Sequence, residues 1–154
     1  LQVSHGFIKS PESLHPDENI DRTTASAIYS LPISNGSINA TALWGVNKIE
    51  DQEGANAFLL EGSWKHNKLE LYSRYEWVQK SPEELNLDEN IYGANSVFAI
   101  NSLTAGLGYD IFKIGPLNIA AGSQFTIYHG NERLDDLYGK NPMALEIFLR
   151  LYHE

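Results

Sequence analysis

The feature that most constrains this chain is an alternation of apolar and polar residues. It recurs over segments of roughly 8–12 residues, and Gly, Pro, Asn and Asp separate one segment from the next. Helical periodicity is nearly absent. Because a period of two places successive side chains on opposite faces of a strand, each segment predicts a strand with one apolar face. The expected strands are 1–8, 22–31, 37–47, 56–65, 68–78, 97–111, 117–129 and 143–153.

The last of these segments shows the alternation best. One face carries Met143, Leu145, Ile147, Leu149 and Leu151, and the other carries Ala144, Glu146, Phe148, Arg150 and Tyr152. The segments 37–47, 97–111 and 117–129 repeat the pattern. A chain of 154 residues with this organisation predicts one all-β domain over residues 1–154.

Hydropathy is compatible with a membrane only if strands cross it. Hydrophobic residues make up 42% of the chain, and no run approaches the roughly 18 apolar residues that a membrane helix needs. A membrane strand shows half its side chains to lipid and half to the lumen, so its mean hydropathy is near neutral. Most of the expected strands reach the roughly 9–11 residues that cross a hydrocarbon core.

The composition of the two faces indicates which one meets lipid. The polar faces of 37–47, 97–111 and 117–129 are rich in Gly, Ser, Thr, Asn and Gln and almost free of Lys, which suits a lumen better than a water-exposed surface. Large aromatic residues lie near the ends of the apolar faces, as in interfacial girdles. These are Tyr29, Trp44, Trp64, Tyr75, Trp77 and Tyr109. The prediction is an antiparallel up-and-down transmembrane β-barrel; a soluble barrel with the faces reversed is the rival.

The connections between strands alternate in length. Short ones are expected at 32–36, 66–67 and 112–116, and longer ones between the other strands, as in bacterial outer-membrane barrels. A two-residue turn at His66-Asn67 would place Trp64 opposite Leu69 and Ser63 opposite Glu70. Apolar residues then face apolar ones, and polar face polar, which supports the strand assignment.

Charged residues on the polar faces are the candidates for lining the lumen. They are Glu61, Glu70, Arg74, Glu76, Glu146 and Arg150. If eight strands close the barrel, these side chains form a paired polar plug, because unpaired buried charge is costly. If the barrel is larger, they line a pore and set its ion preference. Both alternatives stay open.

The long connections hold most of the acidic residues and one internal repeat. Residues 10–20 match residues 81–91 at eight of eleven positions, and both copies begin Ser-Pro-Glu, which is typical of a capped helix start. The alternative is a weak Ca²⁺ or Mg²⁺ site among lipopolysaccharide head groups, since carboxylate oxygens suit these ions. Its ligands would be Asp17, Glu18, Asp88 and Glu89.

Several classes of function are disfavoured. The chain has no cysteine, which excludes disulfides and thiolate metal sites, and its net charge of −9 argues against a nucleic-acid partner. The five histidines are scattered, without a metal-ligand spacing. The sequence pattern does not place a particular nucleophile beside a particular base. We therefore expect neither an enzyme nor a bound cofactor.

Six segments carry a resemblance to a known family, namely 7–12, 22–26, 43–47, 58–61, 138–142 and 148–150. They resemble segments of a family of uncharacterised, porin-like bacterial outer-membrane proteins. The resemblance implies that the chain is the C-terminal part of a longer barrel, with further strands upstream, often in a trimer. Leu1, which opens directly into a strand-like run, also suggests a processed product or fragment. One departure is that His153 and Glu154 follow the aromatic Tyr152, whereas such barrels often finish on the aromatic residue.

The function expected from the sequence is passive passage of small solutes through a Gram-negative outer membrane, with lipid and lipopolysaccharide as partners. One alternative is a closed eight-stranded barrel that adheres or binds the envelope through its acidic loops. A second alternative is a soluble β-barrel that binds an apolar ligand.

Overall fold

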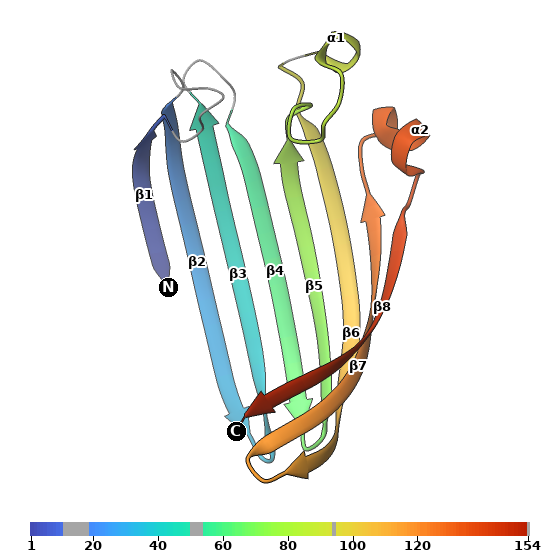
Figure 1. The fold of residues 1–154 in the computed structure, drawn as a ribbon. Coiled ribbons are helices and arrows are strands. Elements are labelled where there is room, and N and C mark those ends of the chain that lie inside the picture. Colours follow the sequence, from blue (N-terminus) through green and yellow to red (C-terminus); the bar gives the residue numbers. More distant parts are fainter. Residues whose placement is uncertain (11–18, 50–53, 94, 154) are drawn as a thin grey trace.

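The structure is a computed structural model and describes residues 1–10, 19–49, 54–93 and 95–153. One antiparallel sheet contains all the strands, and each strand is hydrogen-bonded to its neighbours in sequence (Figure 1). The strands are β1 (Gln2–Lys9), β2 (Asn19–Ile33), β3 (Gly36–Ile49), β4 (Ala55–His66), β5 (Leu69–Lys80), β6 (Phe98–Ile114), β7 (Leu117–His129) and β8 (Met143–His153). The predicted all-β, up-and-down order of eight strands is confirmed.

Of the three short connections, those predicted at 32–36 and 112–116 are tighter than predicted, because β2 and β6 extend further toward them, and the one predicted at 66–67 keeps its length of two residues. Each is a two-residue turn, at Ser34-Asn35, Asn67-Lys68 and Gly115-Pro116. One residue of each turn has a positive φ, namely 59° at Asn35, 51° at Asn67 and 58° at Gly115. Asn and Gly tolerate this conformation, which two-residue hairpin turns require.

The predicted register of the β4–β5 hairpin is wrong by two residues. Trp64 pairs with Leu71 rather than Leu69, and Ser63 pairs with Tyr72 rather than Glu70. The cause is that the turn begins at Asn67, one residue later than predicted. A shift of two keeps every side chain on its expected face, so the division into faces is unaffected.

The sheet is open, with β1 and β8 at its two edges. These eight strands therefore do not make a complete barrel by themselves, and the closed eight-stranded alternative does not describe this chain. In Figure 1 the strands β1 to β4 run side by side, whereas β7 and β8 bend across the lower part of the sheet. Curvature is concentrated in the half that contains β7 and β8, and the edge strands β1 and β8 are not paired with each other.

Two glycines in the more curved half lie under aromatic rings. Gly106 in β6 lies under the ring of Tyr72, and Gly122 in β7 lies under the ring of Phe148. A Cβ at either glycine would collide with the ring above it. Between Asp110 and Phe112 the register of β6 on β7 shifts at a β-bulge, which adds further bend.

The sheet has almost no core of its own. Among the described residues, Phe98, Ala120 and Leu134 are the buried hydrophobic side chains. Large apolar side chains are instead exposed, and on β8 the exposed fractions reach 82% for Ile147 and 76% for Leu149. None of the helices in the described residues is long and apolar enough to cross a membrane.

The long connections after β5 and β7 pack against each other. They contain α1 (Glu89–Tyr92), the 3₁₀ helix η1 (Glu132–Leu134) and α2 (Asp135–Tyr138). The Arg133 guanidinium donates to the Tyr92 carbonyl at 3.0 Å and lies over the Phe98 ring. The Tyr92 and Phe98 rings meet edge to face with their centroids 5.9 Å apart, so Arg133 joins the connection after β7 to both rings.

The predicted helix start at Ser81 is only partly formed. The Ser81 hydroxyl accepts from the Glu84 N–H at 3.2 Å, and the Glu84 carboxylate accepts from the Ser81 N–H at 3.0 Å. This is a capping box. However, the chain turns at Asn86, whose φ is 53°, and α1 begins only at Glu89. Most of the other copy of the repeat, 11–18, lies outside the described residues.

Candidate functional site

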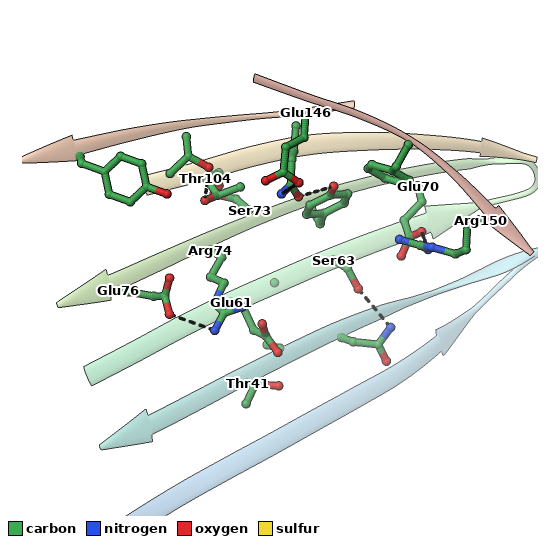
Figure 2. A pocket seen from close by; sticks show the side chains of 18 residues that line it. Thr41, Glu61, Ser63, Glu70, Ser73, Arg74, Glu76, Thr104, Glu146 and Arg150 are labelled. Carbon is green, nitrogen blue, oxygen red and sulfur yellow. Dashed lines mark hydrogen bonds and ion pairs between the residues drawn. The ribbon is translucent and has the colours of Figure 1, made fainter. Parts of the chain in front are cut away.

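The polar side chains of β3 to β8 line a hollow of about 560 Å³ on the concave face of the sheet (Figure 2). The six charged residues predicted to line a lumen all lie here. They are Glu61, Glu70, Arg74, Glu76, Glu146 and Arg150. The period-two pattern brings them together because each occupies the polar face of its own strand, and neighbouring strands pair in register.

The longest-range contact in the hollow joins β5 to β8. The Arg150 guanidinium donates to the Glu70 carboxylate at 2.9 Å, although β6 and β7 lie between their strands (Figure 2). Glu70 pairs with Gly108, and Gly108 pairs with Gly122 on the next strand. Neither glycine has a side chain that would stand between the two charged groups, and the Phe148 ring lies over Gly122 beside the Arg150 guanidinium.

A second ion pair lies on β5 alone. Arg74 donates to Glu76 at 2.9 Å, and Glu76 also accepts from the Ser102 hydroxyl at 3.2 Å. Glu61 is directly opposite Arg74 in the β4–β5 register. Arg74 nevertheless turns toward Glu76, and the side-chain carboxylate of Glu61 has no hydrogen bond or ion pair to any of the described residues.

The fourth carboxylate, that of Glu146, is held through hydrogen bonds of neutral side chains. The Tyr72 hydroxyl donates to the Gln124 side-chain oxygen at 2.9 Å. Gln124 in turn donates its amide to the Glu146 carboxylate at 2.8 Å. Glu146 therefore has a hydrogen bond but no cationic partner among the residues described.

A further charged cluster at the short-turn end was missed by sequence reasoning. The Lys65 ammonium lies 3.1 Å from the Asp110 carboxylate and 3.1 Å from the Tyr152 hydroxyl. These contacts join β4 to β6 and β8. Lys65 and Asp110 continue the polar faces of their strands, so their side of the sheet was foreseeable. The contact between Lys65 and Tyr152 also requires β8 to bend back toward β4, and the alternation does not encode that bend.

The face opposite the hollow is apolar and carries aromatic residues in two bands. Toward the loops, Trp44 pairs with Phe58 and Phe58 pairs with Trp77 in one row across three strands. Toward the short turns lie Trp64 and Tyr109. Apolar side chains fill the strands between these bands, so the sheet presents two chemically different faces.

The four candidate metal ligands are not brought together as a site in the part of the chain that the structure describes. Asp88 caps α1, and its carboxylate accepts from the Asn90 backbone N–H at 2.9 Å. Glu89 is an exposed residue in the first turn of that helix. Asp17 and Glu18 lie outside the described residues. Within the described ranges, no group of three His, Cys, Asp or Glu side chains could hold a metal ion.

Comparison with protein families, curated proteins and solved structures finds no match to this chain. The chemistry of the two faces is therefore the basis for inferring function. A concave face with mixed charges can hold water and hydrated ions. A convex face of exposed apolar side chains can contact hydrocarbon.

Proposed function

We propose that this chain is the C-terminal part of a porin-like outer-membrane β-barrel that lets small solutes pass passively. The observation that carries the proposal is the two-faced sheet, with a charge-lined hollow on its concave side and exposed apolar side chains on its convex side. This is the division of faces that a membrane barrel with a polar interior needs.

The exposure of the convex face is the argument for lipid. Leu145, Ile147 and Leu149 on β8 alone leave 70%, 82% and 76% of their surface uncovered. Fully burying a side chain of this size is worth about 1.5–3 kcal/mol, so a continuous apolar face is unfavourable in water. Hydrocarbon around the barrel would remove that penalty.

The spacing of the aromatic bands is consistent with a bilayer. Leu69, which pairs with Tyr109, and Trp77 are eight positions apart on β5. That separation corresponds to roughly 26 Å along the strand at about 3.3 Å per residue. With strands tilted by about 35–45°, as in outer-membrane barrels, this is roughly 20 Å along the membrane normal, somewhat less than the apolar band of about 25 Å that aromatic girdles border.

The open edges support a barrel with more strands than this chain supplies. In hydrocarbon every backbone N–H and C=O needs an internal partner, and the outer edges of β1 and β8 have none within this sheet. Additional strands would pair with both edges, as the family resemblance implies. A larger barrel leaves room for water in its interior, whereas eight strands leave room only for side chains.

The rival functions are less well supported. A closed eight-stranded adhesin requires β1 to pair with β8, and the two strands are separate edges. A soluble barrel that binds an apolar ligand requires its apolar side chains inside. Here mostly polar side chains line the hollow, with Phe148 among them, and most of the large exposed apolar side chains lie on the opposite face.

Single-channel recording tests the proposal. The full-length protein that contains this chain is purified in detergent, checked for the heat-modifiable gel shift of a folded barrel, and added to a planar lipid bilayer. Stepwise openings with a linear current–voltage relation are expected. An inserted, heat-modifiable protein that gives no conductance would rule the proposal out.

A further inference from the structure

The charges in the hollow do not cancel. Its lining includes the carboxylates of Glu61, Glu70, Glu76 and Glu146, but only the guanidinium groups of Arg74 and Arg150. The lining therefore holds two more carboxylates than cations. The contacts of the four carboxylates show which two have no cationic partner.

Both guanidinium groups are already engaged. Arg150 lies 2.9 Å from Glu70, and Arg74 lies 2.9 Å from Glu76. Glu146 accepts a hydrogen bond from the Gln124 amide, which is neutral. Glu61 is half-buried, and its side-chain carboxylate has no hydrogen bond or ion pair to the described residues. Glu61 and Glu146 thus carry the excess negative charge.

The neighbouring lysine does not offset this excess. The Lys65 ammonium is 3.1 Å from Asp110, so the two charges compensate each other at the short-turn end. Lys65 also contacts the Tyr152 hydroxyl and does not line the hollow. The field inside the hollow is consequently set by the two unpaired carboxylates.

We infer that this concave face makes the passage selective for cations over anions, with Glu61 and Glu146 as the residues that determine the preference. The inference rests on the proposed function. Carboxylates on low-dielectric walls focus a negative potential into the aqueous space and raise the local concentration of cations. The favoured solutes are small hydrated cations and organic molecules with a positive charge.

The test is the reversal potential of the full-length protein in a planar bilayer under a KCl gradient. The expected permeability ratio of K⁺ to Cl⁻ is above one, and it rises at lower ionic strength because screening weakens. The double variant Glu61→Gln with Glu146→Gln should lower the ratio several-fold, toward one. Neither substitution breaks an ion pair, and the amide oxygen introduced at position 146 can still accept from Gln124.

A matched control removes two carboxylates outside the hollow. Glu89→Gln with Glu132→Gln changes the net charge equally but lies in the long connections, so the ratio should stay near that of the unmodified protein. All variants are checked for the heat-modifiable shift before recording. Absence of any conductance would remove the proposed function and this inference together. Conductance with a ratio at or below one, or a ratio that the double variant leaves unchanged, would overturn the inference alone and leave passive passage intact.

Discussion

The two halves of the sheet differ in which strands their side-chain contacts join. In the half formed by β1 to β4, polar contacts join neighbouring strands, as between Ser4 and Thr24 or Ser30 and Asn39. In the half formed by β5 to β8, contacts skip strands, as between Glu70 and Arg150. Both halves have the same alternating pattern and the same turn length. The difference shows that curvature is set by details other than the pattern.

One glycine from each half shows a corresponding difference in the space around it. A Cβ on Gly122 would lie within 2.6 Å of the Leu107 carbonyl and would collide with the Phe148 ring. A Cβ on Gly45, in the other half, would meet the Thr24 methyl at 3.6 Å, an ordinary contact. Both glycines lie on polar strand faces, but of the two only Gly122 has an aromatic ring packed in the space that a side chain would occupy.

The largest expected effect therefore comes from Gly122→Ala compared with Gly45→Ala. Overpacking against backbone and ring should destabilise the curled half by about 1–3 kcal/mol. Gly45→Ala should change stability little. Urea unfolding in detergent micelles, followed by tryptophan fluorescence, measures both. Equal stabilities for the two variants would show that the glycine does not shape the curl.

The next effect in size concerns Arg150→Glu compared with Arg22→Glu. The first places a carboxylate against Glu70 in the hollow and should raise the K⁺ to Cl⁻ permeability ratio of the full-length protein. Arg22 instead donates to Asn47 at 2.8 Å and does not line the hollow, so its substitution should shift the ratio much less. Reversal potentials provide the measurement. A larger shift from Arg22→Glu would mean that the hollow does not control passage.

A smaller effect is expected for Lys65→Met compared with Ser30→Ala. Lys65 holds the end of β8 through Tyr152, so its loss should speed hydrogen exchange of the backbone amides near Leu151. The change in stability should stay below about 1 kcal/mol, because the ion pair with Asp110 is partly exposed. Ser30→Ala should leave exchange in β8 unaltered. Unchanged exchange in the Lys65 variant would argue against a stabilising contact at this end.

The smallest effect on the sheet itself is expected from a change in one of the connections. Asp88→Ala removes the cap of α1 and should destabilise that single turn by about 1 kcal/mol without altering either half of the sheet. Limited proteolysis of the connection between β5 and β6 should be faster, with unfolding of the strands unchanged. If the strands unfolded more easily as well, the loop cluster would have to be part of the sheet's cooperative unit.

The alternation was sufficient to predict the strands, their order and the side of the sheet on which Glu70 and Arg150 lie. It could not predict the β4–β5 register, because moving the partner by two residues leaves every face unchanged. It also could not predict the open sheet. The Tyr72 ring lies over Gly106 and the Phe148 ring over Gly122, and alternation within a segment does not encode such contacts between strands. Lys65 was missed for the same reason.

The claim that the apolar face meets lipid while the polar face meets water can be tested residue by residue. This chain has no cysteine, so each of the substitutions Glu146→Cys, Ile147→Cys, Phe148→Cys and Leu149→Cys gives a single site for a spin label within it, with any cysteine elsewhere in the full-length protein replaced by serine. In liposomes of the full-length protein, labels at 147 and 149 should collide with dissolved oxygen, which concentrates in hydrocarbon. Labels at 146 and 148 should collide with a water-soluble nickel chelate. The reverse alternation, or none, would contradict a membrane barrel with a polar interior.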